Sequence, residues 1–346
     1  MHDGDEFWPN SLGRPVRVLS RLSQGVFARS KRNLGLLATV VGALILLAIL
    51  NPHYLNLNNL MAVALQMSFV GTCSIGTACL IISGNVDLSI GSMYGVCAVA
   101  SAMLAKTLPA APAILAGIIL GGLLGWANGA MVWRVKISPL IITLGTLAVF
   151  RGLALRLTNG FEVRGVRPSY SLFGQAQVLR VAMPVVALVV LAVMAHIILD
   201  MTTLGRHLYA FGGNREACEA AGINGRRLVL ATFAINGLVV GLAAVLAASR
   251  FGTASPTFGV GLELDSIAAA ILGGVAFTGG EGNIPGVVLA VALLGIINSG
   301  LISLGIDPHY SQMVKGGALI IAVAMDQIAH EQRERRRRHL AMQERG

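Results

Sequence analysis

The run LMAVALQMSFVGTCSIGTACLIIS occupies residues 60–83 and contains no charged side chain. The hydrocarbon core of a bilayer is about 30 Å thick, so a helix needs about 20 residues to cross it. In lipid the backbone groups of such a run must bond to one another, which a helix achieves. The run therefore predicts a transmembrane helix.

Nine further apolar runs have a similar composition. They lie at residues 34–50, 88–108, 111–133, 140–157, 181–199, 228–248, 266–279, 284–304 and 310–325. The run at 266–279 is short, rich in Gly and bounded by Asp265 and Glu281, which is typical of a broken or re-entrant helix. The pattern predicts an all-α integral membrane protein with about ten transmembrane helices.

Composition agrees with this class. Of the 346 residues, 55% are hydrophobic and only 12% are charged, whereas a soluble domain carries about 25% charged residues. Gly occurs 42 times, and small residues let helices approach closely in lipid.

Basic residues indicate the orientation. The segments 1–33 and 327–346 together hold twelve of the 26 Lys and Arg residues. Cytoplasmic segments carry an excess of such residues, so both termini are predicted to be cytoplasmic, with a transmembrane domain at 34–326 between them. The charge flanks apolar spans, which favours contact with anionic lipid over binding of nucleic acid.

Two internal segments fit this orientation and one opposes it. The turn with Arg134 and Lys136 and the segment 200–227 fall on the cytoplasmic side. The segment 158–180 falls outside, although it carries more Arg than acidic residues. We give the summed bias of the two tails more weight.

The segment 200–227 is the longest predicted cytoplasmic connection. Within it, Asn214 can cap a helix, Glu216 lies in the first turn, where the helix dipole favours an anion, and Gly222 can end the helix. A short polar helix between two spans is a plausible docking surface for a cytoplasmic partner. The alternative interpretation is a solvated connector.

Two Gly-rich segments are candidates for the transport pathway. In the first, Asp87 can cap the following helix through the amide of Ser89 or Ile90, which suits either a broken-helix gate or a capped turn at the membrane face. In the second, 259–286, the Gly density predicts irregular backbone beside a cavity. The candidate gate or pathway residues are Asn85, Asp87, Ser89, Glu263, Asp265, Gly273, Gly274, Asn236 and Asn298. Polar residues within spans, among them Gln66, Asn128, Asn236 and Asn298, can alternatively serve only to join helices.

Three ordered motifs carry a family resemblance. They are GNVDLSIGS at 84–92, the segment 212–224 that begins GGN and ends GIN, and GLELDSIAA at 261–269 with the Gly pairs at 273–274 and 279–280. In this order they resemble the permease subunits of ribose-type sugar ABC importers, the ribose, xylose, arabinose and galactoside permeases, over about residues 34–326. One departure is Asn85, where the family motif often has a second Gly; the polar tails are also long for the family.

The resemblance implies a subunit of the bacterial inner membrane that translocates a ribose-like monosaccharide. It implies a second permease subunit, as a homodimer, a periplasmic sugar-binding protein, and a cytoplasmic ATPase that docks on the segment 212–224. The residues expected at that contact are Gly213, Asn214, Glu216, Ala217, Gly222 and Ile223. ATP would be bound by the ATPase, because this chain has no G-x-x-x-x-G-K-[ST] loop. We expect no catalytic, cofactor or metal site and no enzyme activity.

Other functions compete with this one. An ion-coupled secondary carrier should place ionisable residues at mid-bilayer, whereas most charges here fall near span ends, although Arg151 and Arg156 lie deeper. An ABC permease for a nucleoside, an autoinducer or a branched-chain amino acid is a further alternative. A non-transporting membrane anchor or receptor would account for the spans alone.

Overall fold

The computed structural model describes residues 13–306 together with residues 310, 313, 316, 317 and 320. The elements in chain order are α1 (Gly13–Leu50), α2 (Leu57–Ile82), α3 (Ile90–Leu104), α4 (Ala110–Val135), α5 (Pro139–Thr158), α6 (Pro168–Gln175), β1 (Gln177–Val178), β2 (Val181–Ala182), α7 (Met183–Met201), α8 (Thr203–Gly213), α9 (Arg215–Ala220), α10 (Gly225–Phe251), α11 (Leu262–Leu272) and α12 (Ile284–Ser303).

The prediction of an all-α chain needs one correction. Strands β1 and β2 form a short antiparallel hairpin, with Val178 opposite Val181. Leu179 and Arg180 between them have φ values of 52° and 68°, and a two-residue turn with both φ positive matches the twist of paired strands. The predicted span at 181–199 therefore starts at Met183, where α7 begins.

Seven helices of the described residues are long and apolar enough to cross a membrane: α2, α4, α5, α7, α10, α12 and the part of α1 from Arg32 to Leu50. Helices α3 and α11, with 15 and 11 residues, are too short to cross by themselves. The predicted run at 310–325 lies mostly outside the described residues. The number ten therefore stays a prediction.

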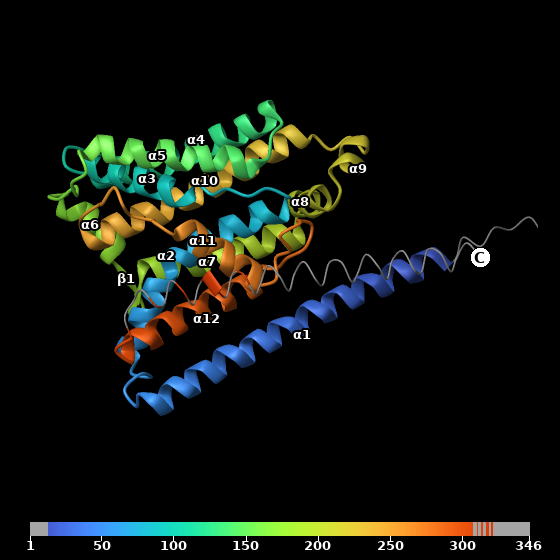
Figure 1. The fold of residues 1–346 in the computed structure, drawn as a ribbon, viewed down its shortest axis with the longest axis horizontal. Coiled ribbons are helices and arrows are strands. Elements are labelled where there is room, and N and C mark those ends of the chain that lie inside the picture. Colours follow the sequence, from blue (N-terminus) through green and yellow to red (C-terminus); the bar gives the residue numbers. More distant parts are fainter. Residues whose placement is uncertain (1–12, 307–309, 311–312, 314–315, 318–319, 321–346) are drawn as a thin grey trace, which may run out of the picture.

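Helices α2 and α10 form the centre of the molecule. In their most apolar stretches 67% and 61% of the residues are buried, against 11% in α1. Helix α1 is a long straight helix that packs on α12 at the edge of the molecule (Figure 1). Its exposed Leu46 and Ile49 are suited to lipid, as are the outer faces of α4, α5 and α7.

Helices α4 and α10 approach each other through glycines. The stripe Gly117, Gly121, Gly125 and Gly129 follows one face of α4, and it meets Gly237 and Gly241 of α10. A β-carbon at Gly121 would overlap the carbonyl oxygen of Gly237 and lie 2.9 Å from the Cα of Gly241. The two backbones are therefore in contact, as small residues permit in membrane helices.

The molecule has two ends, which we call the α9 end and the α6 end (Figure 1). The guanidinium of Arg215 lies 4.8 Å from the ring centre of Trp133, so α4 finishes at the α9 end. Arg32, near the start of the first span, donates to the carbonyl oxygen of Gly274 at 2.7 Å. Three segments predicted to be cytoplasmic thus share one end, while α6 and the hairpin lie at the other. That the α9 end is cytoplasmic stays a prediction.

Both short helices are flanked by irregular backbone, and we call each of them with its flanking segments an interrupted crossing. Residues 83–89 connect α2 to α3 in an irregular, mostly buried path, and residues 252–261 and 273–283 flank α11. At Gly274, with a φ of +87°, the amides of Gly274 and Val275 turn back to the carbonyls of Ile271 and Ala270, which ends α11. The predicted run at 266–279 is corrected accordingly, and its expected broken character is confirmed.

Candidate functional site

The predicted helix in the segment 200–227 is present as α9. The amide of Ala217 donates to the Asn214 side chain at 2.9 Å, which confirms the N-cap. Gly222 has a φ of +84°, and the amides of Gly222 and Ile223 donate to Glu219 and Cys218. Both the cap and the terminator were therefore predictable from residue type and spacing alone.

The outer face of α9 is open in this chain. Gly213, Glu216, Ala217 and Gly222 are exposed, Ile223 is half-buried and Cys218 is buried against the body of the molecule. Arg215 lies over Trp133 and bonds Glu219 at 3.1 Å, which holds the short helix against α4. The segment is thus a small polar projection with a fixed position.

Helix α8, which precedes α9, was not predicted from the sequence. Its first turn is capped by Thr202, whose hydroxyl oxygen accepts from the amide of Gly205 at 3.3 Å. Its apolar face consists of Leu204, Leu208 and Phe211, a spacing of four and three residues that could have revealed the helix.

The three family motifs meet at one place, a cluster of Gly84, Gly212, Gly279 and Gly280 that we call the glycine junction. A β-carbon at Gly212 would overlap the carbonyl oxygen of Ile82, and one at Gly279 would lie 2.9 Å from the Cα of Gly84. The amide of Gly280 donates to the carbonyl oxygen of Ile82 at 2.9 Å. The end of α8, the irregular path after α2 and the loop after α11 are therefore in direct backbone contact.

Further hydrogen bonds hold the loop 273–283 at this end. The hydroxyl of Tyr209 on α8 donates to the carbonyl oxygen of Gly282 at 3.0 Å. The amide of the Asn33 side chain donates to Asn283, whose side chain in turn caps α12. Gly273 lies against the backbone of Val287 on α12, and Gly274 lies against Arg32.

Asp87 organises the irregular path between α2 and α3. One of its oxygens accepts from the amide and the hydroxyl of Ser89 at 2.8 and 2.7 Å, which confirms the predicted capping contact. The side-chain amide of Asn128 on α4 donates to Ser89 at 2.8 Å and to Asp87 at 3.3 Å. Asp87, Ser89 and Asn128 are fully buried, so they fix this path to α4. The side-chain amide of Asn85 donates to Ser83, and the φ of Asn85 is not positive, so a side chain is tolerated there.

The alanine variant Asn128→Ala is expected to lower the free energy of unfolding of the solubilised protein by about 1–3 kcal/mol, because two buried acceptors lose their donor. Thermal unfolding in detergent measures the change. Asn58→Ala, at an exposed position on α2, is the matched control. Equal stability of both variants would show that Asn128 does not hold the path.

The first turns of α3 and α11 meet near the middle of the molecule. A β-carbon at Gly91 of α3 would overlap the carbonyl oxygen of Gly259 and the carboxylate of Glu263. Arg151 of α5 donates to the carbonyl oxygen of Phe258 at 3.1 Å and so holds the loop before α11. Glu263 therefore packs against Gly91 at this contact between α3 and α11, and it lines neither of the cavities described next.

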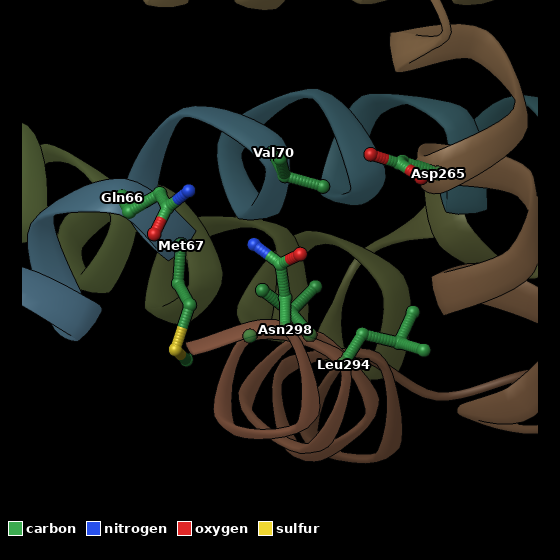
Figure 2. Close-up of a pocket in the computed structure, with 8 residues that line it drawn as sticks. Gln66, Met67, Val70, Asp265, Leu294 and Asn298 are labelled. Carbon is green, nitrogen blue, oxygen red and sulfur yellow. The ribbon is translucent and has the colours of Figure 1, made fainter. Parts of the chain in front are cut away.

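A cavity of about 150 Å³ lies between α2, α11 and α12. Gln66 and Val70 on α2 face Asn298 on α12 across it, and Asp265 on α11 lies at its edge (Figure 2). Met67, Val291, Leu294 and Gly295 complete the lining. Of the predicted pathway residues, Asp265 and Asn298 are thus brought together, and Gln66 joins them.

A second cavity, of about 240 Å³, adjoins the first and shares Val70 and Asp265 with it. Its wall includes Tyr94, Phe251 and Phe258, and the last two rings lie 6.1 Å apart in an edge-on arrangement. Asn236 lines neither cavity, since it is buried where α10 meets Gly76 of α2. The polar groups of α2, α11 and α12 and the aromatic groups of α10 and its following loop therefore form one continuous lining.

Comparison with known proteins gives a consistent result. A family model described as the permease component of branched-chain amino acid transport systems matches residues 59–323. The D-allose transport system permease protein of Escherichia coli is 34% identical over 92% of this chain and 99% of its own length. The ribose import permease protein of Bacillus subtilis is 35% identical over 87% of this chain and 94% of its own length. The L-arabinose ABC transporter permease protein of Azospirillum brasilense is 33% identical over 82% of this chain and 84% of its own length.

No solved structure matches the chain. The family match and the seven helices able to cross a bilayer make it a multi-pass protein of the bacterial inner membrane. Permease components carry out transport and are not enzymes. The chain belongs to the permease family of ribose-type sugar ABC importers.

Proposed function

We propose that the chain is the membrane-spanning subunit of an importer for a ribose-like monosaccharide. A separate ATPase drives it from the α9 end, and a sugar-binding protein delivers the solute to the α6 end. The observation that carries the proposal is the glycine junction, because it connects the exposed α9 segment with both interrupted crossings. The relatives named for allose, ribose and arabinose support a sugar as the solute.

The orientation follows from charge. Arg32, Arg134, Lys136 and the Arg residues of 206–227 gather at the α9 end, so this end is the cytoplasmic one by the positive-inside rule. Both termini then lie in the cytoplasm, where the tails 1–33 and 327–346 can contact anionic lipid.

We further infer that two copies associate in the membrane. Gln66 is exposed in the apolar stretch of α2, where lipid would leave its amide without partners. A second subunit over this face, with the cavity mouth between them, would remove the polar group from lipid. ATP is bound by the ATPase and not by this chain.

Motion reaches the pathway by backbone contact. When the ATPase moves α9, the end of α8 moves with it, and Gly212 presses directly on Ile82 and on the loop 273–283. Flexible side chains are absent at the glycine junction, so little of the displacement is absorbed there. The two interrupted crossings, which line the region of the cavities, are the parts that respond.

The test is the variant Ala217→Arg, in which a bulky charge replaces a small exposed residue on α9. We expect normal insertion, and uptake reduced by about 30-fold or more, the size of an interface hot spot. ATP hydrolysis by the assembled complex should continue without transport. Uptake of labelled sugar and phosphate release are measured on the same reconstituted complex.

The control is Gly35→Arg, which adds the same side chain at an exposed position of α1 where a β-carbon meets nothing within 4 Å. It should transport at the rate of the unaltered complex. If Ala217→Arg does so as well while remaining assembled with its ATPase, α9 is a connector and the coupling surface lies elsewhere.

An ion-coupled carrier is the second candidate, since Asp87 is a buried carboxylate. Its three hydrogen bonds fix a chain turn, which favours a structural role over ion coupling. Uptake by the permease alone that collapses on addition of an uncoupler would support the carrier instead.

A further inference from the structure

We propose that the cavity between α2, α11 and α12 is a sugar-binding subsite of the permease itself, selective for uncharged polyhydroxylated solutes. The proposal rests on the proposed function. It specifies the place between the two ends of the molecule where the sugar binds. The groups that carry it are Gln66, Asp265 and Asn298, which come from three different helices and converge on one space (Figure 2).

The chemistry of these groups suits hydroxyls. A hydroxyl both donates and accepts, and the cavity offers two side-chain amides that do both, together with one carboxylate that accepts. Polar side chains in a spanning helix normally face a water-filled cavity or a protein neighbour.

The apolar part of the lining suits the rest of a sugar. Met67, Val70, Val291 and Leu294 form the wall opposite or beside the polar groups and can contact the C–H face of a pyranose or furanose ring. Small-molecule sites typically combine such apolar walls with a few placed polar groups. In the adjoining cavity, Tyr94, Phe251 and Phe258 offer the aromatic faces on which sugar rings also pack.

Charge separates a neutral sugar from a net anion. Among the described residues that line the two cavities, none carries a positive charge, and Asp265 is common to both. A solute with a net negative charge would meet the Asp265 carboxylate and no basic lining residue, which costs free energy in a partly buried site. The cavity therefore favours a neutral polyol over an anionic solute such as a sugar phosphate.

Gly295 sets the size of the cavity. A β-carbon at this position would overlap the side chain of Met67, which extends from α2 toward α12 and also lines the cavity (Figure 2). Because Met67 is flexible, a methyl group at 295 should push its thioether into the cavity without breaking the fold. Gly295→Ala is thus a variant that narrows the site and leaves every polar group in place.

The experiment uses the permease reconstituted in proteoliposomes with its ATPase and its binding protein. Labelled D-ribose, D-allose, L-arabinose and D-galactose are the probes, each supplied with saturating binding protein so that the maximal rate reports translocation. We expect Gln66→Leu and Asn298→Leu each to lower that rate by about tenfold or more, the effect of losing one hydrogen bond to the sugar. ATP hydrolysis should persist. Asn58→Leu, on α2 but outside the cavity, is the control and should keep the unaltered rate.

Two further readouts distinguish recognition from structure. Deoxy analogues of the transported sugar should be transported more slowly than the sugar by the unaltered complex, and for one analogue this difference should disappear in Asn298→Leu. Gly295→Ala should slow the hexoses more than the pentoses. If Asn298 and Gly295 served only folding, their variants would change neither the rate ratio of sugar to deoxy analogue nor that of hexose to pentose.

The possible failures are distinct. Sugar uptake that Gln66→Leu, Asn298→Leu and Gly295→Ala all leave unchanged would overturn the cavity assignment and leave the proposed function standing. An unaltered complex that transports leucine and none of the four sugars would overturn the proposed function, and with it the selectivity for polyols.

Discussion

Gly121→Val is expected to prevent accumulation of folded protein. The β-carbon alone would overlap the carbonyl oxygen of Gly237, and the two further methyl groups of valine have no space between α4 and α10. Overpacking by added carbons in a core already costs about 1–3 kcal/mol when side chains can adjust. Here backbone meets backbone, so the helices must separate. We expect the yield of folded, detergent-stable protein to fall by about tenfold or more, since total stabilities are only about 5–15 kcal/mol.

The control is Gly145→Val on α5, where a β-carbon meets nothing within 4 Å and the position is exposed. It introduces the same β-branched residue into a spanning helix, so any effect of helix propensity or insertion is shared. Size-exclusion chromatography of a fluorescent fusion measures the folded fraction. Equal yields of both variants would show that α4 and α10 do not depend on close backbone contact.

The second large effect is expected at the glycine junction. Gly212→Ala adds one methyl group, which would overlap the carbonyl oxygen of Ile82 and lie 2.7 Å from the amide nitrogen of Gly280. The end of α8 must then move away from both interrupted crossings. We expect the protein to insert and to bind its ATPase, whereas sugar uptake falls by about 100-fold, as expected for a loss of close to 3 kcal/mol in a required conformational step.

Gly42→Ala on α1, where a β-carbon meets nothing within 4 Å, is the control for Gly212→Ala. Uptake by the reconstituted complex and co-purification of the ATPase are measured in parallel. Normal uptake by Gly212→Ala would exclude the junction as the connection between α9 and the crossings. Loss of both uptake and assembly would assign Gly212 to ATPase binding instead.

Much of the fold follows from local pattern. The runs at 60–83 and 228–248 correspond to α2 and α10, because an uncharged stretch of that length has only one low-energy state in lipid. The cap at Asn214 and the end at Gly222 were predicted from residue type, since both act on amides within a few residues. The hydrogen bond from the amide of Ser89 to Asp87 was predicted on the same local ground.

The helix boundaries and short elements that were predicted wrongly or missed have local causes. The run at 266–279 is apolar enough to continue, but Gly274 ends α11 at Leu272 by adopting a positive φ. Helix α8 was missed because hydropathy identifies spans, and α8 is an amphipathic helix whose apolar face is seen only by its spacing. The hairpin at β1 and β2 needs positive φ at Leu179 and Arg180, which neither residue type suggests.

The lining of the cavity was predicted only in part. Asp265 was selected within the Gly-rich segment 259–286 and Asn298 as a polar residue within a span, and both line the same cavity. Glu263 and Asn236, selected on the same two grounds, lie against Gly91 and Gly76 instead. Spacing within one helix reports which face a residue occupies, but not which other helix covers that face.

The sequence by itself determined the class of protein, the positions of the long spans, the cap and terminator of α9 and the family motifs, because each of these depends on neighbours within a few turns. Only the tertiary structure decided that Gly84, Gly212 and Gly280 touch, that Gln66, Asp265 and Asn298 share a cavity, and that Asn128 bonds Asp87. These groups lie up to about 230 residues apart in the chain. Whether these groups meet depends on which helices pack closely in lipid. Because water exclusion contributes little there, helix pairing is determined by the shape of small-residue surfaces such as the stripe on α4.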